Sequence, residues 1–485
     1  MDQAAAWIEW LVQGIRHELM LFAAVGILVM GLDDLLFDGL WFGIRRSIAR
    51  RAVSRPAGPR LRGVFAVFVP AWDEADVLPH TLVHALRAWV GEAVRLYVGC
   101  YPNDAATLFA AAPFAARDPR VRLVIGDADG PTTKGDNLNR LWDALCEDER
   151  REGLRFAAIV LHDAEDRVHP AEIALYRDWL PDHAMIQIPV VPTKGAGATW
   201  VSGHYGDEFA EAHGKELVVR SHLGLPLPAA GVGCAFARDA LSLLALHRGG
   251  APFRADSLTE DYEAGMLIGH YGLSAAFVEA WSAPGDPVVS RGAFPATLEA
   301  AARQKARWVA GISLAGWDHL GWPSLAGGNG GRLRAWLARW MLWRDRRVPL
   351  AALILLAAYV GMIATGVVWA GEALLGWAPS PIGDGFRLLL AVDAALLLWR
   401  LGMRGHFAAR WYGMREALLS VPRAFVANIV AMLAARRAIL LYGRMLRSRE
   451  VVWDKTRHSE APPPSQLDPL ADPLADPLAM PVRIA

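Results

Sequence analysis

Ala157-Ala158-Ile159-Val160-Leu161-His162-Asp163-Ala164-Glu165-Asp166 joins an uninterrupted apolar run to three carboxylates within four residues. The apolar run predicts a buried strand, and the acids follow the point where that strand ends. Carboxylates this close repel one another unless a cation neutralises them. Mg²⁺ and Mn²⁺ prefer carboxylate and phosphate oxygens and commonly take only one or two protein carboxylates, so we expect a nucleotide diphosphate to complete the coordination sphere. A lone His beside a strand end, such as His162, is more often structural than a ligand.

Short apolar runs alternate with helical stretches on both sides of this segment, from Arg62 to about Trp317. This alternation predicts an α/β layer fold with a mainly parallel sheet, in which ligands bind beyond the carboxyl ends of the strands. The candidate strands are Gly63 to Val69, Val94 to Cys100, Val121 to Ile125, Phe156 to Leu161, Met185 to Val191 and Ala275 to Val278.

Polar residues also follow two other predicted strands, in Trp72-Asp73-Glu74 and in Tyr101-Pro102-Asn103-Asp104. Taken singly, each is more often a turn or a helix N-cap, which Asp and Asn favour. Because all three strand ends would face one crevice, their repetition favours a binding site.

Two predicted helices begin with residues suited to chemistry. Lys134-Gly135-Asp136 opens one helix, and a helix N-terminus beside a lysine suits an anion, although a well-capped helix is an equal explanation. Thr259-Glu260-Asp261 opens another, where the structural alternative is a capping box. A carboxylate held there is also placed to accept a proton from an attacking hydroxyl.

Gln304-Lys305-Ala306-Arg307-Trp308 lies on a predicted helix that starts near Pro295. Amphipathic surface helices often have this pattern. The functional interpretation is an arginine that holds phosphate or carboxylate, beside an aromatic platform for an acceptor.

The composition points to a soluble domain joined to membrane segments. The chain has 485 residues, of which 54% are apolar and twenty are Trp. Its 50 basic residues balance its 50 acidic residues, so no overall positive field indicates nucleic acid. Three widely spaced cysteines without a CxxC pair indicate buried thiols in a reducing compartment, not a disulfide framework or a zinc site.

Three apolar runs predict membrane spans: Leu19 to Leu32, Val348 to Trp369 and Phe386 to Trp399. The first of these is short, so a buried core helix is the alternative for it. Seven arginines between Arg45 and Arg62 predict that the catalytic middle is cytosolic. Asp33, Asp34 and Asp38 are expected near the interface or facing other helices. The run from Leu418 to Leu433 is interrupted by polar residues and predicts an amphipathic helix lying in the interface.

These patterns divide the chain into five parts. We expect an N-terminal anchor with a basic cytosolic segment at 1–61, a catalytic domain at 62–317 and a basic membrane-proximal linker at 318–347. Transmembrane and interfacial helices follow at 348–458. Three Asp-Pro-Leu-Ala repeats, from Asp468 to Ala479, predict a disordered tail at 459–485.

The ordered set of motifs resembles the family 2 glycosyltransferases of the GT-A fold, particularly membrane polysaccharide synthases such as cellulose and chitin synthases. Within that superfamily the chain looks like the bacteriophage adsorption protein B group of bacterial inner-membrane glycosyltransferases. The motifs that carry this closer resemblance are Tyr101-Pro102-Asn103-Asp104, Tyr205-Gly206-Asp207-Glu208-Phe209-Ala210-Glu211, Gly231-Val232-Gly233 and Trp453-Asp454-Lys455-Thr456.

The resemblance implies a role for each matching residue. Asp261 would be the catalytic base, and Gln304, Trp308 and Glu260 would bind the acceptor. Nucleotide-sugar binding would fall to Glu74, Asp104, Lys134, Asp163 and Arg307, and Mg²⁺ or Mn²⁺ binding to Asp163 with Glu165 or Asp166. Two departures from the family pattern are Asp-Ala-Glu-Asp in place of DxD, which leaves the second metal ligand open, and Asp73 in place of Asn.

The resemblance therefore implies an inverting glycosyltransferase that moves a sugar from a nucleotide-sugar donor to a glycan acceptor. The enzyme would act at the cytosolic face of a bacterial inner membrane, in surface or exported polysaccharide synthesis, with membrane lipids and an export partner. Two alternatives are transfer of a single sugar to a lipid-linked acceptor and a non-catalytic membrane assembly protein.

Overall fold

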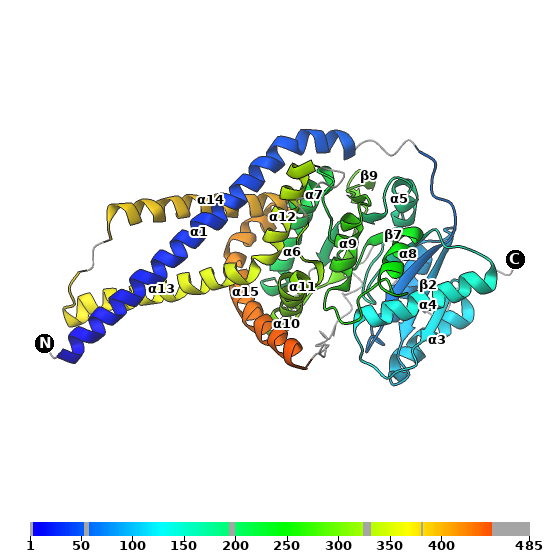
Figure 1. The fold of residues 1–485 in the computed structure, drawn as a ribbon, viewed down its shortest axis with the longest axis horizontal. Helices are drawn as coiled ribbons and strands as arrows, with labels where there is room; N and C mark the ends of the chain where they lie inside the picture. The colour runs from blue at the N-terminus through cyan, green and yellow to red at the C-terminus, as the bar shows by residue number, and fades with distance from the viewer. Residues whose placement is uncertain (1–2, 53–57, 194–198, 324–330, 380–381, 449–485) are drawn as a thin grey trace.

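The chain folds into an α/β domain from which a helical arm projects (Figure 1). The computed structural model describes residues 3–52, 58–193, 199–323, 331–379 and 382–448. The Trp453-Asp454-Lys455-Thr456 motif and the Asp-Pro-Leu-Ala repeats lie outside the described residues.

A seven-stranded sheet forms the centre of the domain, in the order β3-β2-β1-β4-β7-β5-β8. All neighbouring strands are parallel except β7, which runs antiparallel to both β4 and β5. The mainly parallel sheet that the sequence predicts is therefore confirmed. Its strands are β1 (Phe65–Pro70), β2 (Val94–Cys100), β3 (Val121–Ile125), β4 (Ala158–Leu161), β5 (Met185–Gln187), β7 (Cys234–Ala237) and β8 (Ala275–Phe277).

Alternating side chains of each strand pack into two apolar layers. In β1, Phe65, Val67 and Val69 enter one layer, whereas Ala66 and Phe68 enter the other. Burial on both faces explains why these strands are continuous apolar runs. The first layer is covered by α2 (Leu78–Ala88), α3 (Ala105–Arg117) and α5 (Glu172–Trp179), and the second by α4 (Lys134–Glu152), α8 (Arg238–His247) and α9 (Glu260–His270).

The predicted strand from Met185 to Val191 is split in the structure. β5 ends before Pro189, which cannot donate a ladder hydrogen bond, and β6 (Val190–Thr193) instead pairs in parallel with β11 (Ser290–Ala293). A second small sheet pairs β9 (Trp281–Ala283) with β10 (Asp286–Pro287).

The remaining elements connect the domain to the arm. They are α6 (Val201–Glu211), the π-helical turn η1 (Ala212–Glu216), α7 (Leu217–His222), α10 (Leu298–Trp308), the π-helical turn η2 (Val309–Ala315), α11 (Gly316–Leu320) and α12 (Gly331–Arg346).

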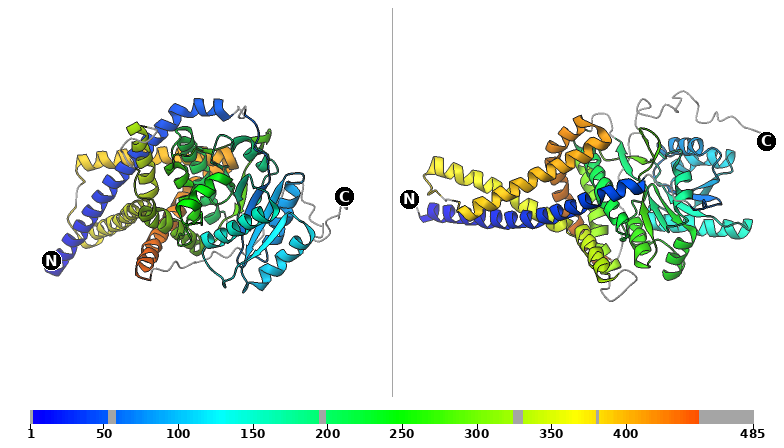
Figure 2. Two further views of the ribbon diagram at one scale, coloured as in Figure 1. Left: turned by 45° about the vertical axis from the view of Figure 1, so that its right-hand side comes forward. Right: turned by 90° about the horizontal axis from the view of Figure 1, so that it is seen from above.

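The arm consists of α1 (Gln3–Ala52), α13 (Val348–Leu375) and α14 (Asp384–Tyr412), which lie side by side in both views of Figure 2. By length and composition, three helices of the described chain could cross a membrane: Trp7–Arg45 of α1, α13, and α15 (Met414–Ser448). The predicted span at 386–399 lies in α14, which carries Arg387, Asp393 and Arg400 and is not among these three. In position, however, α14 belongs to the arm, whereas α15 crosses the base of the arm and packs on the domain (Figure 1).

The three aspartates that interrupt the first apolar run face other helices, as the sequence predicts. Asp33 accepts a hydrogen bond from the Trp340 indole at 2.5 Å and pairs with Arg347 at 2.6 Å. Asp34 also pairs with Arg347, at 2.6 Å, and Asp38 pairs with Lys215 at 2.7 Å. Ion pairs therefore join the base of α1 to Lys215 of η1, to Arg344 of α12 and to Arg347, which directly precedes α13.

Candidate functional site

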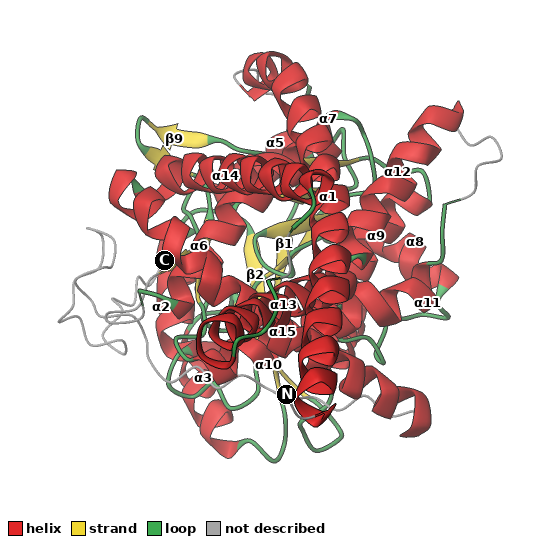
Figure 3. Ribbon diagram, turned by 90° about the vertical axis from the view of Figure 1, so that its left-hand side faces the viewer, coloured by secondary structure: helices red, strands yellow, loops and turns green. Residues whose placement is uncertain are grey.

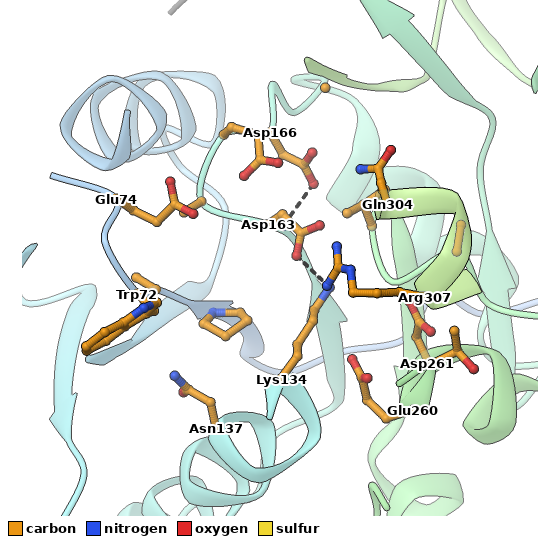
Figure 4. Close-up of a pocket in the computed structure, with 18 of the residues that line it drawn as sticks. Trp72, Glu74, Lys134, Asn137, Asp163, Asp166, Glu260, Asp261, Gln304 and Arg307 are labelled. Carbon is orange, nitrogen blue, oxygen red and sulfur yellow. Dashed lines mark hydrogen bonds and ion pairs between the residues drawn. The ribbon is translucent and has the colours of Figure 1, made fainter. Parts of the chain in front are cut away.

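A single pocket collects the chemistry-bearing residues at the carboxyl ends of β1, β2 and β4 (Figure 4). Its other walls come from the loop before β7, the start of α9, the end of β11 and the last turn of α10. Every residue that the sequence assigns to the site lines this pocket except Asp104: Glu74, Lys134, Asp163, Glu165, Asp166, Glu260, Asp261, Gln304, Arg307 and Trp308.

A buried histidine holds the acidic loop after β4 in place. His162 contacts Asp166 through Nδ1 at 3.0 Å and Glu172 through Nε2 at 2.9 Å, and it lies outside the pocket lining. Burial alone would lower the pKa of His162, but Glu172 and Asp166 raise it to about 10, so the imidazolium neutralises these two acids. The structural interpretation of His162 fits this geometry.

Asp166 and Glu165 of this loop have different environments. One oxygen of Asp166 also accepts the backbone N–H of Asp163 at 3.0 Å, which fixes the turn. Burial, together with the neighbouring carboxylates of Asp163, Glu74 and Asp166, raises the pKa of Glu165 well above its usual value. A cation at Glu165 would relieve this repulsion.

Lys134 sits between the two acidic clusters (Figure 4). It is the first residue of α4, which Thr133 caps by accepting the N–H of Asp136. The Nζ atom of Lys134 lies 2.5 Å from Asp163 Oδ1. Burial would lower the pKa of Lys134, but the carboxylates of Asp163, Glu260 and Asp261 raise it, so this lysine stays charged.

Glu260 and Asp261 form the opposite wall at the start of α9. Burial raises the pKa of Asp261, and burial together with Asp261 raises the pKa of Glu260 to about 8. The capping box is not formed, because Thr259 Oγ1 has no hydrogen-bond partner among the described residues and does not cap the helix. Glu260 Oε1 likewise has no partner within the described chain.

Gly231 allows this wall to approach Lys134. Its φ of +74° is in the left-handed region, and a Cβ atom there would lie 2.0 Å from Asp261 Oδ2 and 3.2 Å from Lys134 Nζ. The Gly231 carbonyl also accepts a 3.5 Å hydrogen bond from Lys134. Only glycine fits between the two groups.

The last turn of α10 contributes Gln304, Arg307 and Trp308 to the pocket. The Arg307 guanidinium points toward Asp163 and Lys134 (Figure 4). Gln304 is buried, and its Oε1 atom has no hydrogen-bond partner in the part of the chain that the structure describes. Arg303 instead points to Glu299 on its own helix, at 3.6 Å.

Asp104 supports the pocket without lining it. Its carboxylate accepts the N–H of Thr107 at 3.2 Å as the N-cap of α3, and the N–H of Asp73 at 2.6 Å. Asp73 has a φ of +54°, so this hydrogen bond holds a strained residue beside Glu74. Asp104 therefore lies near the site, as its position after a strand predicts. Its contacts are those of a helix N-cap, which is the structural alternative.

Several lining residues were not predicted as site residues. Trp72 and Tyr101 pack edge to face at 5.2 Å, and the Tyr101 hydroxyl lies 2.7 Å from Thr132 Oγ1. Their position directly after predicted strands was a usable signal. Phe209 and Phe294 flank Trp308, and the sequence carries no signal for Phe294 because β11 was not predicted.

The donor set fits a divalent cation only if the cation is shared with a bound phosphate. Within the described residues, no three His, Cys, Asp or Glu side chains gather as a complete metal site. Mg²⁺ and Mn²⁺ commonly use one or two carboxylates and complete their shell with phosphate and water. Burial and the neighbouring carboxylate of Asp163 raise the pKa of Glu165, which fits a site where these two carboxylates share one cation.

Comparison with known proteins agrees with this architecture. Residues 158–371 match the model of glycosyl transferase family group 2. The chain is 32% identical over 94% of its length to bacteriophage adsorption protein B of Escherichia coli K12 and to bacteriophage N4 adsorption protein B of Escherichia coli O157:H7, and it spans 63% of the length of these relatives.

A solved mannosyltransferase from Pyrobaculum calidifontis, in complex with GDP-Man and Mn²⁺, has the same fold with a TM-score of 0.50 and 18% identity. The similarity covers 85% of this chain and 99% of the mannosyltransferase chain. Residues 158–371 are therefore similar to glycosyl transferase family group 2, the chain has the fold of the mannosyltransferase, and it is similar in sequence to bacteriophage adsorption protein B.

Proposed function

We propose that this chain is an inverting glycosyltransferase that uses a nucleotide-sugar donor. One observation carries the proposal: a single pocket places Asp163 and Glu165 on one wall, Asp261 on the other, and the cations Lys134 and Arg307 between them. This arrangement matches a reaction in which a diphosphate leaves from one side while a hydroxyl attacks from the other.

The donor side is assigned to the ends of β1, β2 and β4. Asp163 and Glu165 would hold Mg²⁺ or Mn²⁺, because one Asp166 oxygen already binds His162 and the Asp163 N–H. Such a cation would supply charge stabilisation to a departing diphosphate. Lys134 and Arg307 bind diphosphate oxygens, and Glu74 lines the nucleotide end of the pocket.

The acceptor side is assigned to α9 and α10. Asp261 accepts the proton of the acceptor hydroxyl. The hydroxyl oxygen then bonds to the anomeric carbon of the sugar, and the bond between that carbon and the diphosphate breaks. Burial raises the pKa of Asp261, which makes its carboxylate a stronger base than that of an exposed aspartate. Glu260 Oε1 and Gln304 Oε1 have no partner in the described chain, so they are placed to accept acceptor hydroxyls beside Trp308.

The arm suggests where this reaction occurs. We infer that α1, α13 and α14 cross a bacterial inner membrane, with the catalytic domain cytosolic and α15 lying in the interface. A glycan acceptor and a role in surface or exported polysaccharide synthesis, with an export partner, follow from the resemblance to membrane polysaccharide synthases.

A panel of nucleotide sugars tests the proposal. Purified protein in detergent is mixed with extracted membrane lipids and glycans and with each donor in turn, including GDP-mannose, the sugar nucleotide in the structurally similar mannosyltransferase. We expect nucleoside diphosphate release with at least one donor, in the presence of Mg²⁺ or Mn²⁺ and not with EDTA. Release unaffected by EDTA would contradict the metal assignment, and a folded protein that processes no donor would favour the assembly-protein alternative.

Product length then separates the two transfer reactions. Products of increasing length would support glycan extension. Strictly single additions recovered in the lipid fraction would favour the lipid-linked acceptor.

A further inference from the structure

Helix α12 exposes an apolar stripe that the domain does not cover. Leu333, Trp336 and Trp343 are 73%, 60% and 38% exposed. Residues three, four and seven apart share one face of a helix, so Leu333, Trp336 and Trp343 lie on one face, and the half-buried Trp340 at the edge of this face packs against Phe37 of α1. Large exposed aromatic side chains grouped in this way mark an interaction surface.

The opposite face of α12 is fixed to the domain. Ala338 and Met341 pack against Phe37 of α1 and Val219 of α7. Asp345 pairs with Arg220 at 2.5 Å and accepts the Tyr262 hydroxyl at 2.8 Å. The stripe is therefore presented in a defined direction by a firmly packed helix.

The position of α12 at the base of the arm indicates that the bilayer covers the stripe. α12 leads through Arg347 directly into α13 and lies across the base of the arm (Figure 1). In Figure 3, where the arm points toward the viewer, α12 again lies across the view. The Trp340 indole binds Asp33 at this level, and the Trp399 indole binds Asp38 at 2.9 Å.

The residue types match a membrane interface. Tryptophan is enriched at the level of lipid headgroups, and helices with Trp and Leu on one face and Arg beside it lie in the interface plane. Arg332 is exposed at the start of α12, whereas Arg334 donates a hydrogen bond to the Gly224 carbonyl of the domain. Anionic headgroups attract such residues by about 1 kcal/mol for each arginine near the surface.

We propose that α12 lies in the headgroup region of the bilayer that α13 crosses, with Leu333, Trp336 and Trp343 inserted among lipid chains. The inference rests on the proposed crossing by α13. α15 presents a comparable exposed stripe through Leu418, Phe425 and Ile429. The two helices would then hold the catalytic domain against the bilayer, with the acceptor helix α10 directly behind α15.

Spin labels at single cysteines test this placement in nanodiscs of phosphatidylethanolamine and phosphatidylglycerol. The background is Cys146→Ala, since Cys100 and Cys234 are buried. Test sites are Trp336→Cys and Trp343→Cys. Ile363→Cys on α13 is the membrane control, and Phe109→Cys on α3 and Leu246→Cys on α8, which are 78% and 77% exposed, are the water controls.

We expect labels at 336 and 343 to contact lipid-soluble oxygen several-fold more than a water-soluble nickel complex, as at 363 and opposite to 109 and 246. Water-like values at 336 and 343 with a lipid value at 363 would overturn the inference and leave the crossing of α13 intact. A water-like value at 363 would overturn both. Shielding of 336 and 343 from both reagents would indicate a protein on this face and would also overturn the inference.

A second measurement uses the unsubstituted chain. A lipid carrying a photoactivated diazirine is incorporated into the same nanodiscs, and labelled tryptic peptides are identified by mass spectrometry. Labelling of peptides 335–339 and 340–344 is expected. Their absence beside strong labelling of α13 would contradict the placement of α12.

Discussion

Gly231 and Gly249 have similar left-handed backbone conformations but different surroundings. Comparing them distinguishes the effect of a clash in the pocket from the effect of backbone strain. Gly231 has a φ of +74° and Gly249 a φ of +77°, but only at Gly231 would a Cβ atom meet other atoms, namely Asp261 Oδ2 and Lys134 Nζ. The contact at Gly231 is therefore specific to the pocket.

We expect Gly231→Ala to abolish transfer and Gly249→Ala to leave it unchanged. Both alanines should lower the free energy of unfolding by about 1–2 kcal/mol through the left-handed conformation. Displacement of Asp261 should in addition reduce kcat in Gly231→Ala by about 100-fold or more. Thermal unfolding and kcat of both variants check this, and equal activities would show that Gly231 does not set the position of Asp261.

Glu260 gives the stability of the domain a specific pH dependence. Burial, with Asp261, raises its pKa in the folded chain to about 8, above the ordinary value of 4.5. Between these two values the unfolded chain has released this proton and the folded chain still holds it. Deprotonation therefore favours the unfolded chain, and the contribution of Glu260 to stability falls as pH rises through this window.

We expect Glu260→Gln to remove this dependence. Relative to the unchanged protein, the variant should gain stability with rising pH between about 4.5 and 8, by up to about 1.4 kcal/mol per pH unit, and level off above pH 8. Thermal unfolding midpoints of both proteins across this range provide the measurement. A constant difference between the two midpoints would show that Glu260 ionises normally in the fold.

Helix α6 connects the candidate site with the arm. Asp207 pairs with Arg423 of α15 at 3.4 Å, and both side chains are fully buried. Glu208 pairs with Lys305 of α10, and Glu211 pairs with Lys215, which also binds Asp38 of α1. The three acids of the Tyr205 to Glu211 motif thus each tie α6 to a different neighbour, which explains a motif that the sequence marked without a role.

Helices α14 and α15 show where composition and position disagree. α15 passes a test of length and apolar content, but Arg423 is buried within it and its exposed apolar side chains lie on one face. α14 fails the same test, yet it lies beside α1 in the arm. Packing on one side only is typical of an interfacial helix.

Cysteine labelling of intact spheroplasts tests whether α15 crosses the membrane, with α13 as the reference. In the Cys146→Ala background, Leu374→Cys, at the far end of α13, should react with an impermeant maleimide in intact spheroplasts. Leu446→Cys, near the end of α15, should react only after permeabilisation, as should the catalytic-domain control Phe109→Cys. Reaction of Leu446→Cys in intact spheroplasts would show that α15 crosses the membrane.

In the molecule as a whole, the strands that local sequence patterns define are predicted correctly, and those that depend on tertiary packing are not. β2 and β3 have the predicted bounds, because short runs rich in β-branched and apolar residues are recognisable locally. β7 was missed, since Cys234-Ala235-Phe236-Ala237 is short and poor in β-branched residues, and tertiary packing alone makes it an antiparallel strand.

The same limit applies to the candidate site. The strand-end rule brought Glu74, Asp163 and Glu165 to one edge of the sheet, but it does not say which side chains turn into the pocket. Asp104 instead caps α3, and Phe294 directly follows β11, which pairs with β6 from a distant part of the sequence. Contacts between distant segments such as these are not encoded in local periodicity.

The role of Asp261 as the base is tested most directly by comparing transfer and donor binding in Asp261→Asn. The side chain keeps its shape and loses its basicity, so kcat should fall by about 100- to 10,000-fold while the donor dissociation constant, measured by calorimetry, stays within a few-fold. Asp256→Asn, at an acid that is 65% exposed and pairs with Arg254, is the matched control and should keep full activity. Retained turnover in Asp261→Asn, with donor binding intact, would contradict the account by removing Asp261 from the role of base.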